Sequence, residues 1–254
     1  MHMATRLRMP ASFLAACIAV ACCSIPASGQ QSKVTIRTVI QSKVAAKQDK
    51  AAKNRPDGSD VVVWLKPLER SGEGLAPEAL TQKKWQLVQH NKSFRPHVLV
   101  VPVGAVVDFP NRDPFFHNVF SLFDGKRFDL GLYEAGATNS VRFDRLGVSF
   151  LFCNIHPEMS AVVVAVDTSF FGVSSGTGDI TIANVPYGKY ELHIWYERSL
   201  PEDLKAVTRT VTIASLSTDI GPINVPENPS FSTVHKNKYG QDYTPPATPG
   251  YSHP

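Results

Sequence analysis

The chain has 254 residues, which is long enough for one large or two small domains with hydrophobic cores. Its 26 basic and 22 acidic residues give a formal net charge of +4, so the composition argues against a nucleic-acid-binding protein. Beyond residue 29 no apolar stretch is long enough for a membrane-spanning helix, which argues against an integral membrane protein.

Residues 1–29 are typical of a secretory signal peptide. Two arginines precede an apolar stretch at 11–20, and small residues at 27–29 offer a cleavage site. The apolar stretch is too short to cross a bilayer. We therefore expect an exported, periplasmic protein. Acylation of Cys17 or Cys22, which would give a membrane-anchored lipoprotein, is the alternative.

Residues 30–68 predict the first strands of a β-sandwich. Polar and apolar residues alternate at 34–40, and 61–65 is an apolar segment. Between them, residues 43–58 are rich in Lys and Ala and end in Pro-Asp-Gly, which indicates a solvated excursion closed by a turn. Residues 69–82 are interpreted as a connector.

Residues 83–167 predict an all-β domain. Short apolar or alternating segments are separated by Gly or Pro, as in a sandwich or barrel. The segment 161–166 is apolar throughout and is suited to a buried strand. The strands are expected at 85–89, 98–103, 106–109, 140–143, 149–152 and 161–166.

Residues 168–226 are β-rich again. Strands are expected at 179–182 and 190–196, on either side of a turn at 185–188, and then at 208–213 and 220–225. Ser199 and Glu202 resemble a capping box that opens a short helix ending at Val207. Residues 227–254 contain few aliphatic side chains and predict a mobile tail, in which His235 and His253 are expected to bind nothing.

Cysteine usage draws attention to one position. Cys17, Cys22 and Cys23 lie inside the predicted signal peptide, so Cys153 is the single cysteine of the expected mature chain. A lone thiol in an oxidising compartment is a liability unless it is buried or bound to a metal. A buried core cysteine is the simpler interpretation, but the residues next to Cys153 favour a metal.

A ligand-rich loop begins at Cys153. His156 and Met159 follow at C-x2-H-x2-M spacing between two predicted strands, and His117 lies at another strand end. Two imidazoles, a thiolate and a weak thioether form the donor set of copper electron-transfer sites. Zinc is the chemical competitor, but it rarely uses a thioether. The pattern predicts one copper ion held by these four residues.

The segment from Trp85 to Asp167 resembles the cupredoxins, such as plastocyanin, pseudoazurin and amicyanin. The resemblance is carried by Pro-Val-Gly at 102–104, by His-Asn at 117–118 and by the ligand loop, whose short spacing is most like amicyanin. It implies that His117, Cys153 and His156 form a trigonal plane and that Met159 is the axial ligand.

The same resemblance implies roles for the residues around the ligands. The side chain of Asn118 would tie the two ligand loops together. Electrons would leave through the edge of His156, and Phe115, Phe116 and Pro157 would form an apolar docking surface around it. Core packing is the alternative for both phenylalanines.

The segment 181–195 is similar to carboxypeptidase-regulatory and transthyretin-like sandwich modules. Two strands alone cannot bury a stable core, so we expect those of 30–68 to join 168–226 in one discontinuous sandwich. The predicted fold is all-β, a cupredoxin Greek-key sandwich inserted in a second small β-sandwich. This arrangement resembles bacterial exported proteins described as methylamine-utilisation-like.

These features predict a monomeric type 1 (blue) copper protein that carries single electrons between redox proteins and is not an enzyme. The sequence does not name the partner. A periplasmic copper carrier or storage protein would use the same ligands without electron transfer. A carbohydrate-binding or adhesion module with a structural metal site is the third alternative, suggested by the flanking sandwich.

Overall fold

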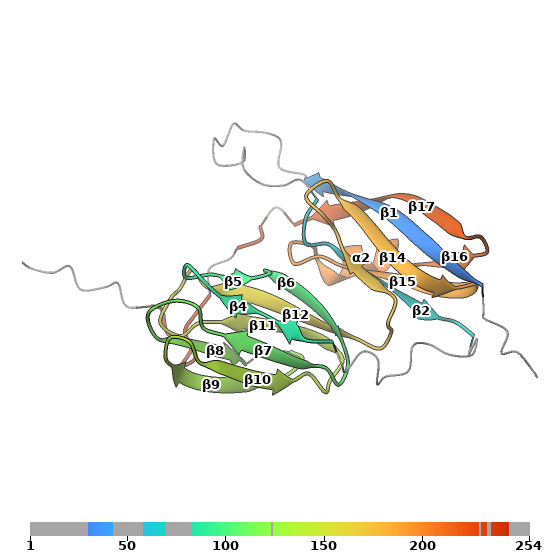
Figure 1. Cartoon of the computed structure of the whole chain (residues 1–254). Helices are drawn as coiled ribbons and strands as arrows, with labels where there is room; N and C mark the ends of the chain where they lie inside the picture. The colour runs from blue at the N-terminus through green and yellow to red at the C-terminus, as the bar shows by residue number, and fades with distance from the viewer. Residues whose placement is uncertain are drawn as a thin grey trace, which may run out of the picture.

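The structure is a computed structural model that describes residues 30–42, 58–69, 83–122, 124–228, 230–232 and 235–243. The predicted signal peptide, most of the 43–58 excursion and of the connector, and the end of the predicted tail lie outside these residues. Within them the fold is all-β with one short helix, and the strands form two sandwiches (Figure 1). No helix among the described residues is long and apolar enough to cross a membrane.

The central part of the chain forms the first sandwich, the green and yellow strands of Figure 1. Its strands are β3 (Trp85–Gln86), β4 (Val88–Gln89), β5 (Phe94–Arg95), β6 (Val98–Pro102), β7 (Val106–Pro110), β8 (His117–Ser121), β9 (Phe128–Tyr133), β10 (Thr138–Arg142), β11 (Gly147–Phe152) and β12 (Ser160–Val166). One sheet has the order β6-β12-β11-β8-β9, and the facing sheet has the order β10-β7-β3. β4 and β5 form a separate short pair.

Strands from before and after this region form the second sandwich. They are β1 (Gln31–Ser42), β2 (Val62–Pro67), β13 (Phe171–Val173), β14 (Asp179–Pro186), β15 (Gly188–Trp195), β16 (Arg209–Ile213) and β17 (Ser217–Glu227), with helix α2 (Pro201–Val207) beside them. β1 lies between β14 and β17, and β2 lies between β13 and β15. The early strands therefore pair with the late ones and share their core, which contains Val34, Leu65, Ile180 and Leu192.

β12 explains why one segment of the sequence is apolar throughout. Ala161, Val163 and Ala165 point into the core of the first sandwich. Val162, Val164 and Val166 point the other way, into a cluster with residues of β2, β13 and β15. Because side chains alternate across a strand, both faces of β12 are buried, one in the core of the first sandwich and one in the cluster between the two sandwiches.

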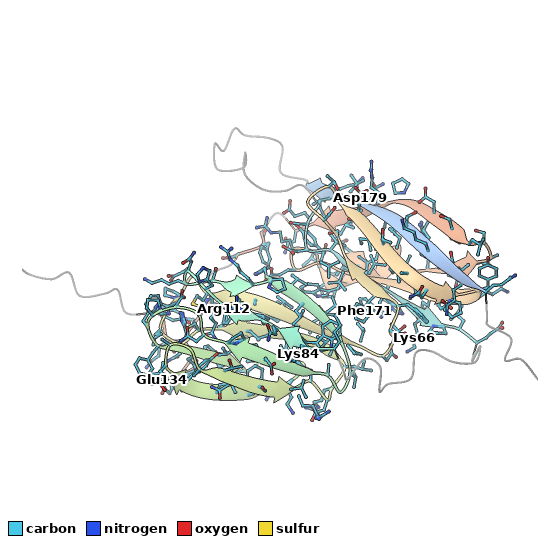
Figure 2. The ribbon with its side chains drawn as sticks, viewed as in Figure 1. Lys66, Lys84, Arg112, Glu134, Phe171 and Asp179 are labelled. Atoms are coloured by element: carbon cyan, nitrogen blue, oxygen red, sulfur yellow. The ribbon has the colours of Figure 1, made fainter. Side chains whose placement is uncertain are left out.

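The second face of β12 belongs to the contact between the two sandwiches. Phe150 of β11 packs against Trp195 of β15, with ring centroids 6.5 Å apart. Phe171 contacts both the first core and the cluster between the sandwiches, and Figure 2 shows it where they meet. The two sandwiches are thus joined by apolar side chains as well as by the chain itself.

Several local predictions differ from the structure. β8 and β9 were not predicted, because polar residues interrupt the apolar pattern of the buried strand β8 and a glycine interrupts the alternation in β9. The turn expected at 185–188 is present between β14 and β15, and these two strands belong to different sheets. The capping box is wrong: Leu200 precedes α2 without a side-chain cap, and the Ser199 hydroxyl donates to the carbonyl oxygen of Pro226 instead.

Candidate metal centre

The four sequence-predicted ligands lie at one end of the first sandwich. His117 is the first residue of β8, and Cys153 directly follows β11. These strands are antiparallel neighbours, so the start of one lies beside the end of the other. His156 and Met159 belong to the loop that connects β11 to β12.

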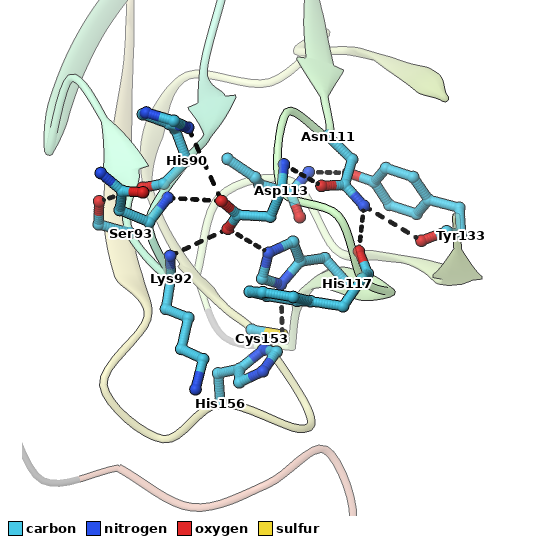
Figure 3. Close-up of polar contacts among 12 residues, drawn as sticks. His90, Lys92, Ser93, Asn111, Asp113, His117, Tyr133, Cys153 and His156 are labelled. Atoms are coloured by element: carbon cyan, nitrogen blue, oxygen red, sulfur yellow. Dashed lines mark hydrogen bonds and ion pairs between the residues drawn. The ribbon is translucent and has the colours of Figure 1, made fainter. Parts of the chain in front are cut away.

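Three of the ligand atoms converge. The Cys153 Sγ atom lies 3.8 Å from Nδ1 of His117 and 3.6 Å from Nδ1 of His156 (Figure 3). The three ligand atoms lie within 4.8 Å of one another. Nitrogen and sulfur ligands about 2.1 and 2.3 Å from a shared ion stand roughly 3.5–3.8 Å apart. The spacing of the donors therefore fits one ion.

Met159 closes the ligand loop. Its backbone N–H donates to the carbonyl oxygen of His156, and its own carbonyl oxygen accepts from the N–H of Cys153. Its side chain is fully buried, as are those of His117 and Cys153, whereas His156 is partly exposed. This local folding keeps Met159 within the core cluster that also contains Cys153.

Asp113 fixes the tautomer of His117. Its Oδ2 atom lies 2.8 Å from Nε2 of His117, so that nitrogen carries the proton and Nδ1 keeps its lone pair for a metal. Burial alone would raise the pKa of the Asp113 carboxyl. The N–H of Lys92, His117 and the N–H of Asn91 outweigh burial and hold this pKa below its ordinary value. Asp113 is therefore a buried carboxylate aimed at a ligand (Figure 3).

Backbone N–H groups surround the sulfur. Burial raises the pKa of the Cys153 thiol, while hydrogen bonds from the N–H groups of Asn118, Ile155 and His156 lower it. These donors are fixed by the backbone and favour the thiolate. The thiolate is the form that binds metals. The positive charge of a bound metal ion would therefore offset the effect of burial on the pKa of Cys153.

His156 forms the partly exposed edge of the centre. Its pKa is lowered by burial and by His117, so the neutral, metal-binding form is favoured. The ring of Phe115 packs against both imidazoles, with centroid distances of 5.2 Å to His117 and 5.5 Å to His156. Of the predicted docking residues, Phe116 and Pro157 are exposed and Phe115 is half-buried against the ligands.

The side chain of Asn118 differs from its predicted role. Its amide nitrogen donates to Asp129 Oδ1 at 2.7 Å and to the carbonyl oxygen of Gly131 at 2.9 Å, both in β9. The contact with Cys153 comes from the backbone N–H of Asn118. The amide nitrogen thus ties β8 to β9, while the Oδ1 atom of Asn118 is buried without a hydrogen-bond partner among the described residues.

Sequence reasoning missed other residues around the centre. Asp113 was not singled out, although its position four residues before His117 was a visible signal. Tyr243 and Lys238 lie in the predicted mobile tail, yet they hydrogen-bond to Cys153 and Asn154 of the ligand loop. Residues 235–243 therefore pack against the ligand loop, where the sequence predicted a mobile tail.

No family model and no curated protein sequence matches the chain. Among solved structures, a purple cupredoxin from Nitrosopumilus maritimus is 24% identical and covers 33% of this chain and 100% of its own, with a TM-score of 0.30. A copper-containing nitrite reductase from Thermus scotoductus SA-01 is 23% identical and covers 40% of this chain and 25% of its own, with a TM-score of 0.32. A Cu(I) amicyanin variant is 18% identical and covers 41% of this chain and 98% of its own, with a TM-score of 0.32.

Proposed function

We propose that this protein is an exported type 1 copper protein that carries one electron at a time between redox partners. One observation carries the proposal: the Cys153 sulfur and the Nδ1 atoms of His117 and His156 meet in a buried place, with Met159 in the same loop. When bound there, copper would supply the one-electron change between Cu(I) and Cu(II). The thioether favours copper over zinc.

The surrounding residues hold this cage rigid. His117 begins a strand that is buried along its whole length. A hydrogen bond from its Nε2–H to Asp113 fixes the orientation of its ring. Cys153 is anchored by the end of β11 and by backbone donors to its sulfur. Ligands that cannot move keep nearly the same positions in both oxidation states, which is what fast electron exchange requires.

The partly exposed edge of His156 is the proposed point of electron transfer. Ile155, which is 43% exposed, and Pro157, which is also exposed, flank His156, and Phe116, which is 54% exposed, directly precedes the other imidazole ligand, His117. An apolar rim of this kind suits brief docking of another redox protein. Phe115 contributes by packing the two imidazoles together.

Export to the periplasm, with or without a lipid anchor, and a non-enzymatic role belong to the same proposal. Copper carriage is the alternative use of this cage. A carrier surrenders its metal readily, whereas an electron carrier retains it through repeated reduction and oxidation. Transfer of copper to a chelator during redox cycling distinguishes the two functions.

The test is addition of Cu(II) to the purified protein, followed by its visible spectrum. We expect an intense blue sulfur-to-copper band at one equivalent of copper and its loss in Cys153→Ser. Met159→Leu is the matched variant, which removes the thioether and retains the apolar volume. We expect this variant to stay coloured with a shifted band and an altered reduction potential.

The contrary result is also well defined. A colourless one-to-one zinc complex that is insensitive to Met159→Leu, together with failure to form the blue band, would contradict the copper proposal. It would favour a structural metal site instead.

A further inference from the structure

A segment from beyond the second sandwich lies across the metal-binding end of the first. β17 ends at Glu227 in the second sandwich, yet residues 235–243, here called the strap, contact β9, β11 and the ligand loop. The strap therefore connects the last part of the chain to the residues beside the proposed thiolate.

The contacts of the strap concentrate on either side of the Cys153–Asn154 peptide. The Tyr243 hydroxyl donates to the carbonyl oxygen of Cys153 at 2.7 Å. The backbone N–H of Lys238 donates to the side-chain oxygen of Asn154 at 3.0 Å. On the preceding residue, the His235 ring packs on Phe152 with a centroid distance of 4.1 Å.

A salt bridge and internal hydrogen bonds give the strap a defined shape. Lys238 Nζ lies 2.8 Å from Asp129 Oδ2 on β9, and the Lys238 side chain is only 23% exposed. Asn237 organises a turn: its side-chain oxygen accepts from the N–H groups of Tyr239 and Gln241. The strap is thus folded against the domain by polar contacts as well as by ring packing.

We propose that the strap is a positioning element of the metal centre and that Tyr243 is its positioning residue for Cys153. This inference rests on the proposed function only in taking Cys153 as the metal thiolate. A hydroxyl that holds the Cys153 carbonyl restricts rotation of the peptide that follows the sulfur-bearing residue. Lys238 holds the next side chain, so both residues are fixed from outside the ligand loop.

The chemistry of Tyr243 suits this role. Burial, together with the negative charges of Cys153 and Glu158, raises its pKa to about 12. The hydroxyl is held as the donor to the Cys153 carbonyl oxygen at 2.7 Å. Its ring also packs edge-on against His235, at a centroid distance of 5.4 Å. The expected consequence is slower opening of the ligand loop and better protection of the thiol.

The experiment measures the alkylation rate of Cys153 in the metal-free protein. Mass spectrometry of the labelled peptide separates Cys153 from Cys17, Cys22 and Cys23. Tyr243→Phe removes only the hydroxyl, and a chain ending at Ser232 removes the strap. A chain ending at Tyr243 retains the strap and controls for shortening. Tyr190→Phe is the matched control, because the Tyr190 hydroxyl donates to the Pro186 carbonyl at 2.8 Å in the second sandwich.

We expect Tyr243→Phe to speed labelling about 2- to 10-fold, as loss of one hydrogen bond to a local opening step predicts, and removal of the strap to speed it roughly tenfold or more. Tyr190→Phe and the chain ending at Tyr243 should label like the unaltered protein. In the copper-loaded protein, Tyr243→Phe should also release metal to a chelator faster.

Three results would count against the inference. Unchanged labelling in Tyr243→Phe would remove the role of Tyr243, and unchanged labelling in the chain ending at Ser232 would remove the role of the strap. An equal rise in Tyr190→Phe would indicate general loosening and would also count against it. Failure of the unaltered protein to form a blue copper complex would contradict the proposed function. The labelling rates of the metal-free protein would still test whether the strap positions Cys153.

Discussion

Asp113 is the residue on which the ligand role of His117 most depends. The carboxylate is 3% exposed and receives the N–H groups of Asn91 and Lys92 besides the His117 ring. Asp113→Asn keeps the size but removes the charge that holds the imidazole proton on Nε2. We expect the affinity for copper to fall about 10- to 100-fold, as is typical when a partner of a ligand is lost. Competition with a copper chelator measures this change.

The matched control for this prediction is Asp144→Asn. Asp144 also has a side-chain partner, Lys126 Nζ at 2.9 Å, but half of its side chain is exposed and it lies away from the ligands. Its substitution should leave copper affinity within about twofold, because exposed ion pairs contribute little. Equal losses in both variants would contradict a specific role of Asp113.

At the residue scale, the sequence could reveal only the local part of the site. Cys153, His156 and Met159 lie within one loop, so their spacing alone indicates a metal, and His117 is recognisable at a strand end. Tyr243 lies 90 residues from Cys153 along the chain, and only tertiary folding brings it there. No short spacing pattern carries that information.

At the scale of elements, β12 is the strand that packs one face into the core of the first sandwich and the other into the contact between the sandwiches. Its continuous apolar sequence correctly predicted a buried strand, because side chains on both of its faces are buried. β8 is just as buried, but its polar residues, among them His117, Asn118 and Ser121, conceal it from an apolar pattern. β8, which positions the ligand His117, was therefore harder to predict than β12, whose side chains only fill the hydrophobic clusters.

The two faces of β12 lead to a paired prediction. Val163→Ala deletes two methyl groups in the core beneath the metal centre, and Val164→Ala deletes them in the contact between the sandwiches. Each should lower the free energy of unfolding by roughly 1–3 kcal/mol. Only Val163→Ala should also speed copper release, because its cavity opens into the core that contains Cys153 and Met159.

Denaturant unfolding and chelator-driven copper release test this pair. Val164→Ala serves as the control for Val163→Ala, since the residues are neighbours, carry the same side chain and are both 0–2% exposed. Equal acceleration of copper release by the two variants would contradict the separation of the two cores.

At the scale of the whole molecule, strand pairing follows from a simple requirement. Two strands cannot bury a core alone, and β1 and β2 pair with strands that follow the first sandwich. The contact cluster between the sandwiches was not predicted, because it depends on how the two pack. The resemblance of 168–226 to carboxypeptidase-regulatory modules stays a prediction.

An ion pair also crosses between the sandwiches. His97, just before β6, lies 2.7 Å from Glu197, which follows β15. The hydrogen bond to Glu197 raises the pKa of His97; burial lowers it, and the charges of Glu197 and Asp60 raise it further. Asp60 faces the same pair, and burial raises the pKa of its carboxyl.

The raised pKa values of His97 and Asp60 determine how the stability of the fold changes with pH. The folded protein binds the His97 proton more tightly than the unfolded chain does. The stabilisation is therefore complete below about pH 6.5 and is lost as the pH rises through the raised pKa of His97. Asp60 contributes in the same direction, but in the acidic range where carboxyl groups titrate. Stability should therefore fall as the pH is raised from 6 towards 8, in part through His97.

Glu197→Gln tests this dependence, because the amide oxygen still accepts a hydrogen bond while the charge that raises the pKa of His97 is gone. We expect the fall in denaturant midpoint between about pH 6 and pH 8 to become shallower. Glu202→Gln is the control: this exposed residue of α2 undergoes the same chemical change, and the slope should stay that of the unaltered protein. A Glu197→Gln slope equal to that of the unaltered protein would mean that His97 does not link the sandwiches through its charge.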